Sequence, residues 1–205
     1  LFGPETPLES IGIQTSNSVL HFSGPLTLHF ADGTTHVTDA LRYESTLPVA
    51  EIERAVRITT AAERLLSVEN RKTTFLQLAR ADANRTTLII ATSFPTQAVR
   101  RLLEKLPHDL PHHHFGDTDP AGFHILQKLR QVTKRQVRPF RMNFRDREQS
   151  APLTRTEKLT LDRLLAGPLM DDCHEPLRML QSTGRRGDFE QESLGAPSLK
   201  GWPFY

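Results

Sequence analysis

The sequence predicts an α/β protein with a parallel four-stranded sheet that is flanked by helices and preceded by a small β element. From residue 57 onward, short apolar runs alternate with longer amphipathic stretches, the pattern of strand–helix repeats. The most uniformly apolar run, residues 86–91, suits a strand covered on both faces. Hydrophobic residues make up 37% and charged residues 24% of the 205 residues, values typical of a chain that buries a core.

The N-terminal part of the chain has a different pattern. Residues 19–24 and 26–30 alternate apolar and polar side chains around a Gly-Pro pair, and Asp32-Gly33 marks a turn before a further short run. We expect a small antiparallel β element here. A helix over residues 49–56, opened by a proline, should follow it.

This change of pattern predicts a division of the chain near residue 57. Residues 1–56 are expected to be the end of a truncated upstream region, and residues 57–205 to be the α/β domain. The chain begins with neither an initiator Met nor the charged and apolar regions of a signal peptide.

The elements of the second part follow in a regular order. We expect four strands and five helices, the strands at 64–69, 86–91, 111–116 and 137–144 and the helices at 72–80, 96–106, 121–132, 154–166 and 175–182. Short links between strands and helices favour a parallel sheet sandwiched by helices. In such sheets, ligands bind at the carboxyl ends of the strands.

Acidic residues follow two of these strand ends. Glu69 ends the first strand, and Asp117 and Asp119 follow the third, just before Pro120 opens a helix. Taken alone, Asp119 suits a helix N-cap, and Asp117 suits a turn. If the first and third strands are neighbours, however, three carboxylates converge, and a divalent cation would relieve their repulsion. Oxygen ligands indicate Mg²⁺ or Mn²⁺ rather than zinc.

The order of these motifs resembles a known family. Val68-Glu69-Asn70 followed by Gly116-Asp117-Thr118-Asp119-Pro120-Ala121-Gly122 is similar to the Toprim pattern of topoisomerases, primases and related nucleases. With Ser93-Phe94-Pro95 and the late Phe189-Glu190-Gln191-Glu192, the order is most similar to the JetD family, the nuclease subunits of Wadjet plasmid-defence systems. The resemblance covers roughly residues 60 to 195.

The resemblance implies a Toprim-like fold and a metal-dependent DNA endonuclease. Glu69, Asp117 and Asp119 would be its catalytic residues and its Mg²⁺ or Mn²⁺ ligands, with Glu69 also a general acid or base. It further implies cleavage of double-stranded DNA within an SMC-like complex, by a homodimer that supplies one site per strand.

Two other functions remain open. A transesterase like topoisomerase VI needs a tyrosine nucleophile, yet the only tyrosines, Tyr43 and Tyr205, lie outside any helix-turn-helix pattern, which favours hydrolysis. A function of another class is a non-catalytic module that binds DNA or a protein partner and keeps its acids for stability.

Several further residues have a structural and a functional interpretation. Glu190 and Glu192 either lie in a solvated tail or support the site, and the run from Lys128 to Arg147 is either a solvated face or a phosphate-contacting surface. His112-His113-His114 is a weak zinc candidate, because only its first and third side chains share a strand face.

The composition also bears on the compartment. No apolar run reaches the roughly 18 residues of a membrane span. Cys173 is the only cysteine, so an intramolecular disulfide is excluded and a reducing cytoplasm is expected. Without an activating partner beyond His174, Cys173 is not expected to be a nucleophile.

Overall fold

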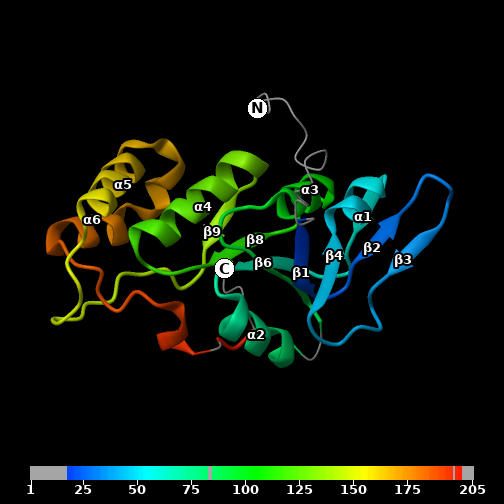
Figure 1. Ribbon diagram of the computed structural model, residues 1–205, viewed down its shortest axis with the longest axis horizontal. Coiled ribbons are helices and arrows are strands. Elements are labelled where there is room, and N and C mark those ends of the chain that lie inside the picture. Colours follow the sequence, from blue (N-terminus) through cyan, green and yellow to red (C-terminus); the bar gives the residue numbers. More distant parts are fainter. Residues whose placement is uncertain (1–17, 83–84, 196, 200–205) are drawn as a thin grey trace, which may run out of the picture.

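The computed structural model describes residues 18–82, 85–195 and 197–199, which form a mixed α/β fold. A six-stranded sheet has the order β4-β1-β7-β6-β8-β9, and a second sheet has the order β3-β2-β5. Helices lie on both faces of the larger sheet (Figure 1). The predicted α/β class is therefore confirmed.

Four neighbouring strands of the large sheet run parallel. These are the four strands expected from the sequence, β6 (Arg64–Val68), β7 (Thr87–Ala91), β8 (His112–Phe115) and β9 (Val137–Pro139). β9 is shorter than the predicted 137–144. Pro139 has no N–H to donate, and Arg141 has a φ of 54°, so the extended conformation ends there.

The prediction of a four-stranded, all-parallel sheet was wrong in its extent. β1 (Val19–Ser23) pairs antiparallel with β7, and β4 (Ser45–Pro48) pairs antiparallel with β1, which makes the sheet six-stranded and mixed. Without β1, the buried strand β7 would expose a row of unpaired backbone groups at a sheet edge. The division of the chain near residue 57 stays a prediction, and both sheets contain strands from each side of it.

The expected N-terminal β element is split between the two sheets. β2 (Thr27–His29) forms the predicted hairpin with β3 (Thr35–Val37) and also pairs with β5 (Arg57–Thr59), whereas β1 joins the large sheet. The chain passes from one sheet to the other at Gly24, which has a φ of 116°. A Cβ on Gly24 would lie 2.6 Å from the carbonyl oxygen of Thr87, so only glycine fits.

The helices cover two distinct cores. Leu65, Leu88 and Ile90 face a core shared with α3 (Gln97–Lys105) and α4 (Pro120–Thr133). The alternate strand residues, among them Leu66, Ile89 and Phe115, face α2 (Leu76–Ala81) on the other side of the sheet (Figure 1). This alternation is the two-residue period of a strand buried on both faces.

The remaining helices surround this framework. They are α1 (Val49–Arg54), α5 (Arg155–Ala166), α6 (His174–Thr183), the 3₁₀-helices η3 (Pro168–Cys173) and η4 (Gln191–Leu194), and the π-helix η2 (Arg71–Phe75) that precedes α2. α5 begins with a capping box, in which Thr154 Oγ1 accepts from Glu157 N at 3.3 Å and Glu157 Oε2 accepts from Thr154 N at 2.8 Å.

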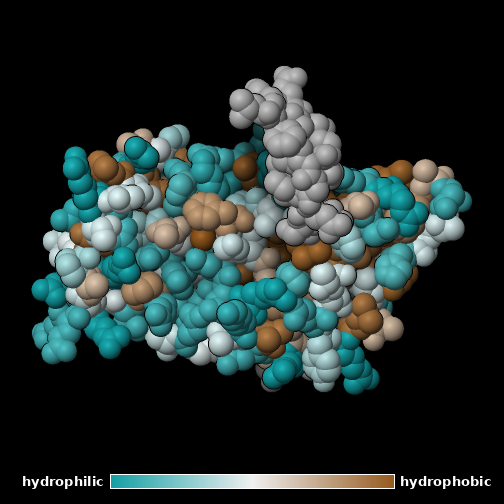
Figure 2. Space-filling view, in the orientation of Figure 1, coloured by the Kyte–Doolittle hydropathy of each residue, from teal (hydrophilic) through white to brown (hydrophobic). Residues whose placement is uncertain are grey.

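Polar side chains cover most of the face shown in Figure 2, where hydrophobic residues form separated spots. Among the described residues, no helix has the length and apolar character needed to cross a membrane.

A buried arginine completes the end of α3. Arg135 is only 6% exposed, and its guanidinium donates to the carbonyl oxygens of Leu103, Leu106 and Pro107, at 3.0 Å for Leu103 and 2.8 Å for Pro107. Carbonyls at a helix C-terminus have no partner within the helix, so this side chain satisfies them.

Arg135→Met is expected to lower the free energy of unfolding by about 2–4 kcal/mol, because buried carbonyls lose their donors. Urea unfolding measures the change. The matched control is Arg147→Met at an exposed position, which should stay within about 0.5 kcal/mol of the wild type. Equal effects of the two substitutions would contradict this role of Arg135.

Candidate acidic site at the carboxyl edge of the sheet

The pairing of β6 with β8 brings two predicted site residues together. Val68 is the register partner of Phe115, so the chain leaves both strands at the same edge of the sheet. Glu69 N donates to the Phe115 carbonyl oxygen at 3.0 Å, and Asp117 N donates to Glu69 Oε2 at 3.0 Å. Glu69 and Asp117 are therefore joined directly.

Asp119 has a structural role that the sequence also predicts. It is the N-cap of α4, and its Oδ1 accepts from Gly122 N at 2.8 Å. The side chain is 8% exposed, and burial raises its pKa although the hydrogen bond from Gly122 opposes this shift. One carboxylate oxygen of Asp119 is thus hydrogen-bonded to the N-terminal end of α4.

Burial and mutual repulsion perturb the carboxyl groups at this edge. The pKa of Glu69 is raised to about 7. Burial is the largest cause, and the charges of Asp117, Asp119 and Glu192 also contribute. Burial also raises the pKa of Asp117 to about 6, with Asp119, Glu192 and Glu190 adding to the shift. Hydrogen bonds from Asp117 N and Gln191 N oppose these shifts.

The segment after Gly187 forms hydrogen bonds with residues of the acidic site. Thr118 N donates to the Phe189 carbonyl oxygen at 2.9 Å, and Gln191 N donates to Asp117 Oδ1 at 2.9 Å. Glu192 accepts from the side-chain amide of Asn70, which directly follows Glu69. Glu190 and Glu192 thus lie beside the site rather than in a detached tail.

The fit of this edge to a cation is mixed. Within the described ranges, no group of three or more His, Cys, Asp or Glu side chains is spaced to hold a metal ion. The available donors are nevertheless carboxylate oxygens, the ligands that Mg²⁺ prefers. Burial and, to a lesser extent, the neighbouring negative charges raise their pKa values, and a cation would neutralise these charges. The metal-binding role of Glu69, Asp117 and Asp119 stays a prediction.

The histidine run behaves as its strand position predicts. Ser67 Oγ lies 3.0 Å from His112 Nε2 and 2.9 Å from His114 Nδ1, so these two rings share one face of β8. Burial lowers the pKa of His113 to about 4 and that of His114 to about 3, so these rings are neutral. Ser67 could not be predicted as a partner of these rings, because an isolated serine within an apolar strand carries no recognisable signal.

Neither Cys173 nor Tyr43 has the surroundings of a catalytic residue. Cys173 is buried, and burial raises the pKa of its thiol to about 12, which excludes a reactive thiolate at neutral pH. Tyr43 is 62% exposed and lies beside Asp82 and Arg85, near the start of β7 and thus at the opposite edge of the sheet. Tyr205 lies outside the described residues.

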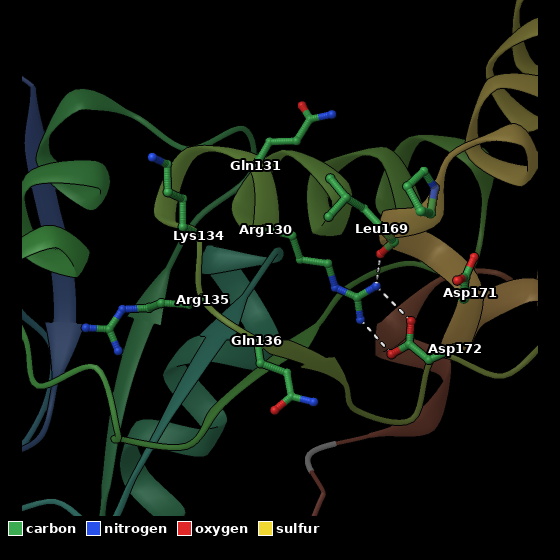
Figure 3. A pocket seen from close by; sticks show the side chains of 9 residues that line it. Arg130, Gln131, Lys134, Arg135, Gln136, Leu169, Asp171 and Asp172 are labelled. Atoms are coloured by element: carbon green, nitrogen blue, oxygen red, sulfur yellow. Dashed lines mark hydrogen bonds and ion pairs between the residues drawn. The ribbon is translucent and has the colours of Figure 1, made fainter.

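A pocket of about 700 Å³ lies beside the C-terminal half of α4 (Figure 3). Its lining does not include Glu69, Asp117 or Asp119. Arg130 donates from Nη1 and Nη2 to both carboxylate oxygens of Asp172, at 2.8 and 2.7 Å, along one wall of the pocket. Arg135, also in its lining, is engaged by backbone carbonyls. Two of its basic side chains are therefore already neutralised or occupied.

Fold and site together define an α/β protein with an acidic site at the carboxyl edge of its sheet. Residues 26–202 match the family model described as "Wadjet protein JetD, C-terminal". The match covers most of the chain, and the chain belongs to this family. No curated protein matches the sequence.

Gly122→Ala is expected to disrupt the acidic turn. A Cβ at this position would lie 2.2 Å from the carbonyl oxygen of Asp117, so the backbone that carries both aspartates must shift. We expect a loss of about 1–3 kcal/mol in the free energy of unfolding. Gly167→Ala is the control, since its nearest neighbour would lie at 3.5 Å, and thermal unfolding compares the two. A fully stable Gly122→Ala protein would contradict the close approach.

Asp117→Asn is expected to stabilise the metal-free protein at pH 8. The folded-state pKa of Asp117 is raised to about 6, so its carboxyl group destabilises the fold as pH rises from about 3.9 through 6. Asparagine removes this charge. After solvent screening, we expect a gain of about 1 kcal/mol at pH 8 and none at pH 4. Urea unfolding in EDTA measures both, and a loss at pH 8 would contradict the unfavourable burial of this charge.

Proposed function

We propose that this chain carries a Toprim-type, metal-dependent DNA endonuclease site that acts in Wadjet plasmid defence. The observation that carries the proposal is the hydrogen bond of 3.0 Å from Asp117 N to Glu69 Oε2. It joins the acid after β6 to the Asp-x-Asp segment after β8. Family membership and the raised pKa values of both acids support this proposal.

The three acids would bind the ion, and Glu69 would have a second role. Glu69, Asp117 and Asp119 would hold Mg²⁺ or Mn²⁺ through the carboxylate oxygens that their backbone hydrogen bonds leave free. The ion would supply charge stabilisation for the phosphate oxygens. Glu69 would also exchange a proton with the attacking water or the leaving oxygen.

The proposed DNA contact uses only part of the basic run. Three of its arginines are engaged within the protein: Arg130 by Asp172, Arg135 by backbone carbonyls, and Arg145 by Asp188 and the Glu190 carbonyl oxygen. Four basic side chains are exposed, at Lys134, Arg138, Arg141 and Arg147. Exposed cations of this kind bind phosphates by displacing counterions.

The proposed setting is a complex in the cytoplasm. Double-stranded DNA is the substrate, subunits of an SMC-like complex are the partners, and a homodimer supplies one site per strand. The family description names a Wadjet protein, which supports the defence role.

Transesterification is the second candidate. The position of Tyr43 near the start of β7, opposite the acids, favours hydrolysis over attack by a tyrosine of the described residues. The other candidate, a non-catalytic module, is supported by the engagement of Asp119 as a helix cap. It predicts neither cation binding nor cleavage.

Wild-type protein is expected to gain stability in Mn²⁺ and to cut plasmid DNA. Thermal unfolding with increasing Mn²⁺ should show a gain that follows mass action, about 2.7 kcal/mol at one hundred times the dissociation constant. Glu69→Gln and Asp117→Ala should abolish both the gain and the cleavage.

Asp109→Asn is the matched control, because this exposed aspartate precedes β8 at the opposite edge of the sheet. It should behave as the wild type. Mn²⁺ stabilisation without cleavage would favour the non-catalytic module, and protein joined covalently to DNA ends would favour the transesterase. Stabilisation that persists in Asp117→Ala would refute the proposed site.

A further inference from the structure

A buried polar chain lies directly behind Glu69. Ser67 on β6 and His114 on β8 are fully buried, and His112 is 2% exposed. Ser67 Oγ stands between the two rings, 3.0 Å from His112 Nε2 and 2.9 Å from His114 Nδ1. Three polar side chains in the middle of a hydrophobic sheet cost free energy unless they are hydrogen-bonded, so their alignment needs an explanation.

The far end of this chain points to the acidic site. His114 Nε2 is buried and has no hydrogen-bond partner among the described residues. A Cβ placed on Gly116 would lie 2.7 Å from His114 Nε2 and 3.0 Å from Glu69 Oε2, so both atoms face the same small space. Gly116 keeps that space free of a side chain. His114 Nε2 and Glu69 Oε2 therefore border the same space.

The number of protons limits how the chain can be arranged. The Ser67 hydroxyl has one proton, and its possible acceptors are His112 Nε2, His114 Nδ1 and, at 3.3 Å, the His113 carbonyl oxygen. The shortest of these contacts, at 2.9 Å, is the one to His114 Nδ1. If Ser67 donates there, the neutral ring of His114 carries its proton on Nε2, facing Glu69.

We propose that His114 is a positioning residue for Glu69, held by Ser67 and His112 so that its Nε2–H donates to the Glu69 carboxylate. The inference rests on the proposed metal site. A small change in the orientation of the Glu69 carboxyl group, whose terminal torsion is soft, would close this hydrogen bond. The carboxylate would then accept from Asp117 N, as it does in the structure, and from His114, and its remaining lone pairs would be left for the ion.

A purely structural histidine predicts something different. If His114 only fills space in the sheet, a phenylalanine of similar size should replace it with little change at the acids. If it positions Glu69, loss of the nitrogen should weaken cation binding, since partners of metal ligands contribute about 10–100-fold to affinity. Stability alone does not separate the two roles, so the decisive measurements are cation affinity and the ring tautomer.

Mn²⁺ titration is the first test, by calorimetry on the wild type and four variants. His114→Phe and Ser67→Ala are expected to weaken Mn²⁺ binding at least tenfold. His114→Gln, which keeps an N–H near the position of Nε2, should restore affinity to within about threefold of the wild type. The matched control is His113→Phe, because this neighbour lies on the opposite face of β8 and should bind as the wild type does.

The second test is the tautomer of His114 in the wild type, read from two-bond ¹⁵N–¹H correlations at pH 7.5. The expected tautomer has its proton on Nε2, and a proton on Nδ1 would overturn the inference even if every variant failed to fold. Wild-type affinity in His114→Phe would also overturn it. Wild-type protein that binds no Mn²⁺ would instead refute the metal site, and with it the positioning role, whichever tautomer is observed.

Discussion

The parallel pairing of β6 with β8 is the constraint on which the site depends. Its register places Val68 opposite Phe115, so the next residues of both strands leave the sheet side by side. Two hydrogen bonds hold Glu69 at this edge. Its N–H donates to the Phe115 carbonyl oxygen, and its carboxylate accepts from Asp117 N. A shift of one residue would turn Glu69 to the other face of the sheet and separate it from Asp117. The hydrophobic faces against α2 and against α3 and α4 fix this register, because each strand is buried on both sides.

The edge concentrates negative charge in a partly buried place, which is unfavourable for stability alone. Glu69 and Asp117 have raised pKa values because burial and neighbouring carboxylates both disfavour ionisation. The segment from Phe189 to Glu192 adds two more carboxylates while its backbone donates to Asp117. Sites whose groups are arranged against stability in this way are typically functional. The polar chain of His112, Ser67 and His114 behind Glu69 is also unfavourable for stability alone, since apolar side chains at these buried positions would need no hydrogen-bond partners.

Much of the fold could be predicted because its strands and helices differ in period and in their end signals. The alternation of strand and helix patterns predicts the four parallel strands, the helix that begins near residue 154 and the N-cap Asp119, all of which the structure contains. The sheet of β2 and β3 followed from Asp32-Gly33. The attachment of β1 and β4 to the large sheet could not be predicted. Alternation shows that a strand has a buried face, but the choice of partner depends on which edge is left open after distant strands have paired.

The sequence by itself determined the α/β class, the order of elements and the acids at two strand ends, because each depends on short-range patterns. The tertiary structure alone decided that β6 and β8 are neighbours, since pairing across more than forty residues leaves no local trace. It also decided that Gln191 N donates a hydrogen bond to the Asp117 carboxylate, and that Ser67 lies between two histidines. Such contacts join residues far apart in the chain, and the packing of whole helices against the sheet brings them together.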